Sequence, residues 1–76
     1  RTAPPFRPAP NPIRDTLLIQ AEQPLRHVYI YHQSGSLLWT FTEKVIPTAN
    51  WPAGIFWVGV EFEDGKIHYG KVVKAE

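Results

Sequence analysis

Four hydrophobic residues occupy every second position between residues 56 and 62: Phe56, Val58, Val60 and Phe62. Alternate residues of a strand lie on the same face, so this spacing predicts a strand with one buried face. Asp64-Gly65 follows, and a second run rich in β-branched and aromatic residues comes after it. This order predicts a hairpin closed by a type I′ turn. The hairpin within Trp51–Lys74 is therefore the predicted core of the fold.

The same period of two predicts further strands over residues 16–20, 26–32 and 36–42. Gln33-Ser34-Gly35-Ser36 separates the last two of these strands and predicts a tight turn, with Gly35 in the left-handed conformation. Residues 43–46 predict either a continuation of the third strand or a short edge strand. The residues expected to face inward from the first two strands are Leu17, Ile19, Val28 and Ile30. One face of the third strand carries Leu37, Trp39 and Phe41.

The last predicted strand contains a conflict between its two faces. Ile67, Tyr69, Lys71 and Val73 alternate with His68, Gly70, Val72 and Lys74. A regular strand with the first set inward would place Lys71 among hydrophobic residues. Either a β-bulge at Gly70 shifts the register, or the stem of Lys71 extends along the surface. We predict the bulge.

Residues 1–10 contain four of the eight prolines and are predicted to form a linker. Proline excludes helix and removes hydrogen-bond donors from a sheet, so this segment is expected to form at most an edge strand near residues 5–7. Residues 11–76 then form one domain. No segment has convincing helical periodicity, and six or seven short strands predict an all-β sandwich or, as the alternative, a small barrel.

Composition excludes several classes of protein. The chain has 76 residues, no cysteine and a net charge of +1. Disulfides and thiolate metal sites are excluded, and no strong charge attracts nucleic acid. No hydrophobic run approaches the roughly 20 residues of a membrane helix.

Little in the chain predicts catalysis or a cofactor. His27 and His32 are five positions apart, so they face opposite sides of one strand and do not converge on a metal. Ser34 and Ser36 flank Gly35 as ordinary turn residues, so no catalytic residue, metal or cofactor is predicted. If Phe56 faces inward, its neighbours Ile55 and Trp57 face outward, and exposed hydrophobic patches of this kind mark contact surfaces. The chemistry therefore favours a docking module over an enzyme.

Four motifs along the chain resemble one family. Residues 11–17 (NPIRDTL) are similar to a "PNP…D.L" motif, and residues 28–38 (VYIYHQSGSLL) to "v.iyd..G.lv". Residues 52–58 (PAGIFWV) resemble "PaGiYfv", and DGK at 64–66 with KVVK at 71–74 resembles "dGk…KvvK". Their order and spacing are those of the C-terminal sorting domains of cargo proteins of the type IX (Por) secretion system. This chain departs from the family at His32, where Asp is usual, and at Phe56, where Tyr is usual.

The resemblance implies an immunoglobulin-like antiparallel β-sandwich of seven strands that acts as a secretion signal. Such a domain folds in the periplasm and is recognised by an outer-membrane translocon and its shuttle protein. A sortase-like surface peptidase removes it from many cargoes and links the cargo to anionic lipopolysaccharide at the outer-membrane surface. The cleavage point is expected in or before the proline-rich segment. The residues expected to contact the translocon are Gly35, Pro52, Gly54, Lys71, Val72, Val73 and Lys74.

Other interpretations remain open. The glycines have a purely conformational explanation, and the lysines have one as charges that protect an edge strand from aggregation. An exposed edge strand also permits dimers. The alternative function is an immunoglobulin-like carbohydrate-binding module that stacks sugar rings on Tyr31, Trp51 and Trp57. A nucleic-acid-binding barrel is disfavoured by the low net charge.

Overall fold

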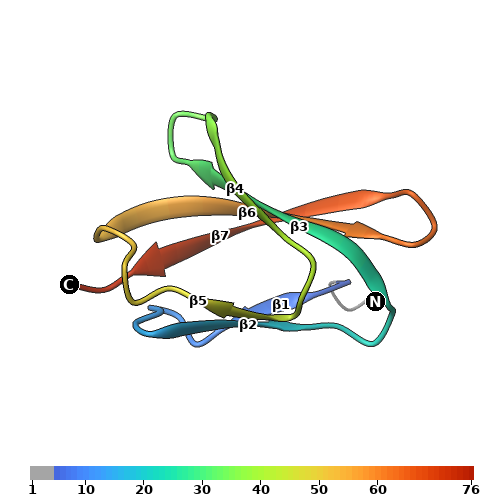
Figure 1. Cartoon of the computed structure of the whole chain (residues 1–76), viewed down its shortest axis with the longest axis horizontal. Helices are drawn as coiled ribbons and strands as arrows, with labels where there is room; N and C mark the ends of the chain where they lie inside the picture. The colour runs from blue at the N-terminus through green and yellow to red at the C-terminus, as the bar shows by residue number, and fades with distance from the viewer. Residues whose placement is uncertain (1–4) are drawn as a thin grey trace.

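Two antiparallel sheets face each other in the computed structural model, which describes residues 5–76. The first sheet has the order β1-β2-β5, with bounds Arg7–Ala9, Thr16–Gln20 and Val45–Pro47. The second has the order β4-β3-β6-β7, with bounds Leu37–Phe41, Leu25–His32, Gly54–Phe62 and Ile67–Lys74. Figure 1 shows the sheets as two layers, and the described residues contain no helix. The predicted all-β sandwich of seven antiparallel strands is confirmed.

The core lies between the two sheets and follows the predicted alternation. Phe56, Val58, Val60 and Phe62 of β6 are at most 2% exposed. Such burial contributes roughly 1.5–3 kcal/mol for each large side chain before conformational entropy is subtracted. The four residues expected to face inward from β2 and β3 are also buried: Leu17, Ile19, Val28 and Ile30. The period of two therefore identified the buried face of three strands.

Both hairpins of the larger sheet close with a three-residue loop that ends in glycine. In the β6–β7 turn, Gly65 N donates to Phe62 O at 2.9 Å and Phe62 N donates to Lys66 O at 3.0 Å. The β3–β4 turn has the equivalent bonds between Gly35 and His32 and between His32 and Ser36. Among the described residues, positive φ occurs only at Gly35, Gly54 and Gly65. The predicted type I′ turn at Asp64-Gly65 is therefore wrong, because its first central residue also needs positive φ.

Strand β7 pairs with β6 in one unbroken register from Glu61↔Ile67 to Gly54↔Lys74. The predicted bulge at Gly70 is therefore absent. The set that faces the core contains Val72 and Lys74, whereas Lys71 lies on the outer face and is exposed. Gly70 faces inward opposite Val58, and its lack of a side chain leaves room for Phe6: a Cβ added at Gly70 would lie 3.3 Å from the Phe6 ring. The Phe6 ring therefore fills the space in the core that a side chain at this position of β7 would otherwise occupy.

The proline-rich segment contributes to the sandwich. Its edge strand, predicted at residues 5–7, lies at Arg7–Ala9 and pairs with β2. Phe6 is 6% exposed and belongs to the core, so it is not part of a free linker. Residues 1–4, where the rest of the predicted linker falls, lie outside the described residues. The alternative left open at residues 43–46 is settled by β5, a short edge strand in the opposite sheet from β4.

Candidate docking surface

The outer face of the four-stranded sheet carries a group of exposed hydrophobic and aromatic side chains. Cross-strand pairing places Ile55 opposite Val73, and Trp57 opposite both Lys71 and Tyr31. Ile55 is 38% exposed, Trp57 40% and Tyr69 60%. Together with the half-buried Tyr31 and Val73 and the exposed Lys71 beside them, these residues form what we call the outer-face patch; it consists of Tyr31, Ile55, Trp57, Tyr69, Lys71 and Val73. The predicted exposure of Ile55 and Trp57 is thus part of a larger surface formed by three strands.

Gly59 forms the floor of the patch. It lies on the outer face of β6, opposite Tyr69 in β7 and Tyr29 in β3. A Cβ added here would lie 2.8 Å from the Tyr69 ring and 3.4 Å from the Tyr31 ring. The two tyrosine rings therefore fold over the glycine and lie 6.2 Å apart between centroids. Burial raises the pKa of Tyr31, and the neighbouring Tyr69 hydroxyl raises it further.

A polar cluster lies next to the patch on the same face. Glu61 Oε1 is 3.0 Å from His27 Nδ1, and it accepts a hydrogen bond of 3.0 Å from the Tyr29 hydroxyl. These bonds, led by that of His27, hold the pKa of Glu61 below its ordinary value. The bond to the same carboxylate raises the pKa of Tyr29. The outer face therefore has an aromatic region and an adjacent hydrogen-bonding region.

This cluster predicts a loss of stability in acid. A lowered pKa in the folded state means that the Glu61 contribution is fully present above its ordinary pKa of 4.5. It is lost as the pH falls through the lower pKa of the folded state. We expect the free energy of unfolding, measured with urea between about pH 6 and pH 3, to fall less steeply in Glu61→Gln than in the wild type. Glu63→Gln, at the exposed β6–β7 turn, serves as the matched control. An unchanged pH profile in Glu61→Gln would contradict the role of the cluster.

The residues predicted to contact the translocon are brought to one end of the larger sheet. His32 pairs with Phe56, so the β3–β4 turn with Gly35 lies at the end where β6 begins. Gly54 pairs with Lys74, so β7 ends there too. Figure 1 shows this end with the C-terminus, the start of β6 and the projecting β3–β4 hairpin. Three motifs that are far apart in the sequence therefore lie at the same end of the sheet.

Only some of these residues present side chains to the outside. Lys71 is exposed and Val73 is half-buried, whereas Val72 is fully buried and Lys74 is 9% exposed. Lys74 Nζ donates to Trp51 O at 3.1 Å, which ties the last strand to the turn before β6. A partner that binds the native domain cannot contact the side chain of Val72. The accessible part of the KVVK motif is Lys71 and Val73.

The glycines of this end have a conformational role. Gly35 has φ of 100° and Gly54 has φ of 141°, values that other residues rarely adopt. Apart from the adjacent residues, no atom of residues 5–76 lies within 4 Å of a Cβ added at either position, so close packing does not require glycine there. Pro52 is exposed on the turn before Gly54. Any recognition of Gly35 and Gly54 therefore depends on the shape of the turns that they allow.

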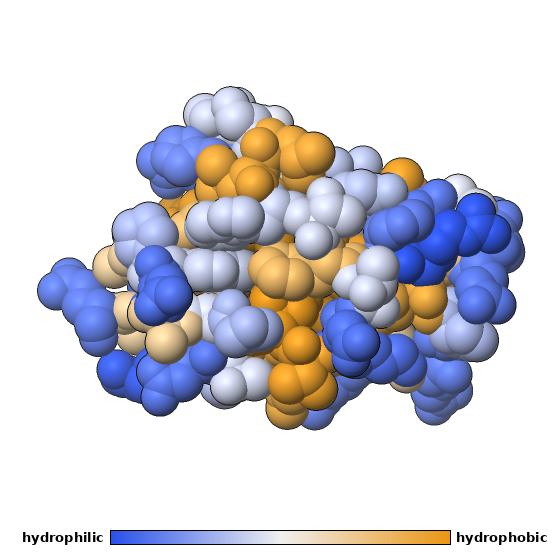
Figure 2. Space-filling view, in the orientation of Figure 1, coloured by the Kyte–Doolittle hydropathy of each residue, from blue (hydrophilic) through white to orange (hydrophobic). Residues whose placement is uncertain are grey.

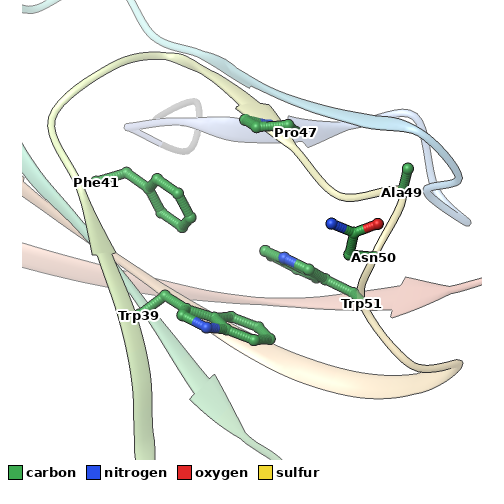
Figure 3. A pocket seen from close by; sticks show the side chains of 6 residues that line it. All are labelled: Trp39, Phe41, Pro47, Ala49, Asn50 and Trp51. Carbon is green, nitrogen blue, oxygen red and sulfur yellow. The ribbon is translucent and has the colours of Figure 1, made fainter.

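The aromatic residues proposed for sugar stacking do not form one site. Tyr31 and Trp57 pair across the outer face, but Trp51 is 6% exposed and stacks on Trp39 at 5.0 Å on the other side of the sheet. Trp39 and Trp51 line a hollow of about 250 Å³ between β4 and the chain that follows β5 (Figure 3). The sequence signal for this hollow was the shared face of Trp39 and Phe41.

Comparison with other proteins adds no candidate function. Family models, curated proteins and solved structures include no match to this chain. Residues 5–76 contain no group of three or more side chains arranged to hold a metal ion. In the same part of the chain, no helix is long and hydrophobic enough to span a membrane.

Proposed function

We propose that this chain is a C-terminal sorting domain that directs a cargo protein through the type IX secretion system. The observation that carries the proposal is the convergence of three motifs at one end of the larger sheet. Gly35, the Pro52–Gly54 turn and the end of β7 lie there together. A recognition surface needs its parts on one rigid scaffold, and adjacent paired strands supply this. The domain acts as an address and has no catalytic role.

The proposed recognition uses shape together with a few exposed side chains. The translocon and its shuttle protein contact the two glycine-containing turns, Lys71 and Val73, and the neighbouring Ile55 and Trp57. The domain folds in the periplasm, so the surface exists only after the strands have paired. The cargo then reaches the outer-membrane surface or the medium, where a sortase-like peptidase joins it to anionic lipopolysaccharide.

The position of β1 restricts the proposed cleavage point. Residues 7–9 are paired with β2 and Phe6 is buried in the core. Proteases bind extended and accessible backbone, and paired strands do not offer it. We therefore place removal of the domain before Phe6 and not throughout residues 1–10.

A fusion to a periplasmic reporter tests the proposal in a cell with a type IX system. We expect the wild-type domain to export the reporter and Lys71→Glu to retain most of it in the periplasm. Lys66→Glu is the matched control, because Lys66 is also exposed but lies in the turn at the opposite end of the sheet. A wild-type fusion that stays in the periplasm would refute the proposal. Equal losses in both variants would refute the location of the surface.

One observation favours a carbohydrate-binding module as a second candidate. The exposed Trp57 and Tyr69 form an aromatic surface with the half-buried Tyr31, beside the hydrogen-bonding groups of Glu61 and Tyr29. Sugar rings stack on such surfaces while their hydroxyl groups bond to nearby polar groups. Saturable quenching of tryptophan fluorescence by a glycan, abolished in Trp57→Ala, supports this candidate; no quenching by any glycan tested removes it.

A further inference from the structure

The sandwich has four edge strands, and three of them carry features that prevent pairing with another chain. Strands β1 and β5 have three residues each and contain Pro8 and Pro47, which lack a hydrogen-bond donor. Strand β7 contains the exposed Lys71, and charged residues at an edge oppose association. Natural sheets use short strands, proline and lysine for this purpose. Strand β4 is the remaining edge.

The edge of β7 is also covered by the chain before β2. Ile13 N donates to Val73 O at 2.8 Å and Ala75 N donates to Ile13 O at 2.9 Å. The amide oxygen of Asn11 accepts from Val73 N at 3.3 Å. Backbone groups at the end of β7 are therefore already bonded within the chain.

Among residues 5–76, strand β4 has no proline, charge or covering segment, and its one irregularity is a shift in its pairing with β3 that leaves Leu38 without a partner. Its sequence, Leu37–Phe41, contains no proline and no charge, and within the described part of the chain it pairs only with β3. Leu37 is 54% exposed, Leu38 39% and Trp39 37%. Figure 1 shows the β3–β4 hairpin projecting from the body, and Figure 2 shows hydrophobic surface over it. An exposed and hydrophobic edge of this kind is a template for another strand.

The hollow beside β4 indicates what kind of strand fits. Trp39 and Phe41 line it from β4, and Pro47 of β5 and Trp51 of the chain that follows β5 line it from the other side. A strand added to β4 would place alternate side chains over this hollow, so those side chains should be hydrophobic and uncharged. The chain contains such a strand in β4 itself, since Trp39 and Phe41 alternate with uncharged residues.

We propose that two copies of this domain associate through β4, which pairs antiparallel with β4 of the second copy. The two four-stranded sheets then form one continuous sheet around a two-fold axis. Because β4 has no charge, this pairing opposes no like charges, and the net charge of +1 gives little repulsion between copies. The pairing also covers the exposed edge of Trp39. The inference does not depend on the proposed function.

Sedimentation velocity over a concentration series tests this association. We expect the wild-type domain to shift from monomer towards dimer as its concentration rises, and Leu38→Lys to remain monomeric at every concentration. Leu18→Lys is the matched control, because Leu18 is 38% exposed but lies on the central strand β2. It should dimerise like the wild type. A wild type that stays monomeric overturns the proposal, as does a Leu38→Lys variant that still dimerises.

A second measurement keeps the test independent of charge substitutions in β4. The chain has no cysteine, so Thr40→Cys provides a single site for a nitroxide spin label. We expect dipolar broadening between labels at Thr40→Cys at dimer-forming concentrations. No broadening is expected for Glu63→Cys, which lies at the opposite end of the sheet. Broadening at Glu63→Cys alone would show association through a different surface and would overturn the pairing through β4.

Discussion

Replacing Phe56 by alanine is expected to lower the free energy of unfolding by about 3–5 kcal/mol. Replacing its neighbour Trp57 by alanine is expected to lower it by less than about 1 kcal/mol. Phe56 is 2% exposed and its ring lies 5.0 Å from Trp51 and 6.3 Å from Trp39, so its removal leaves a cavity in the core. Trp57 points to the outside and loses only cross-strand contacts with Tyr31 and Lys71.

The consequences for the protein differ just as strongly. Small domains have a total stability of roughly 5–15 kcal/mol, so Phe56→Ala removes a large share of it. Urea unfolding followed by circular dichroism measures both variants without depending on tryptophan fluorescence. Under the proposed function, Trp57→Ala also reduces export of a reporter although the domain stays folded. Equal destabilisation by the two substitutions would contradict the alternation of inward and outward residues in β6.

The two lysines of the last strand are expected to respond differently to alanine. Lys74→Ala should lower the free energy of unfolding by about 2–4 kcal/mol, because its buried stem is lost and Trp51 O loses a donor. Lys71→Ala should change it by no more than about 0.5 kcal/mol, since Lys71 is exposed on the outer face. Under the proposed function, the two substitutions have the opposite order of effect on export of the folded protein. Lys71 contacts the translocon directly, whereas Lys74 affects export only by stabilising the fold.

Urea unfolding of both variants at one pH, together with the amount of exported reporter, separates these effects. The control for export is a measurement at a low temperature, where Lys74→Ala is still largely folded. If Lys74→Ala then exports normally and Lys71→Ala does not, Lys71 is part of the recognised surface. A Lys71→Ala variant that is as unstable as Lys74→Ala would show that the register of β7 differs from the one described.

The clearest failure of prediction from sequence was at Gly70. The alternation along residues 67–74 is compatible with either face inward, and neither set is wholly hydrophobic. The pairing of β7 with β6 turns Gly70 inward, and Phe6, more than sixty residues away in the sequence, fills the space above it. Phe6 lies in a proline-rich segment that local rules predict to be a linker. Local pattern cannot predict a contact that only the packing of β1 beside β7 creates.

The turn at Asp64-Gly65 shows a smaller failure of the same kind. The dipeptide correctly predicted a hairpin and the need for positive φ at Gly65. The loop nevertheless has three residues, because the pairing of β6 with β7 places Phe62 opposite Lys66 across the turn. Strand register determines how many residues remain for the loop, and register is a property of the whole sheet.

Sequence alone was sufficient for the class of fold and for the inner faces of β2, β3 and β6. Hydrophobic residues at every second position of a strand lie on one face, so all of them are buried only when that face points to the core. It also identified Ile55 and Trp57 as exposed, since they alternate with Phe56.

Tertiary structure decided the other features of the surface. Only the pairing of β3, β6 and β7 brings Gly35, Pro52–Gly54 and Lys71 to one end. Only the packing of the two layers buries Lys74 and leaves β4 as the unprotected edge. These features depend on contacts between distant segments, which no local pattern contains.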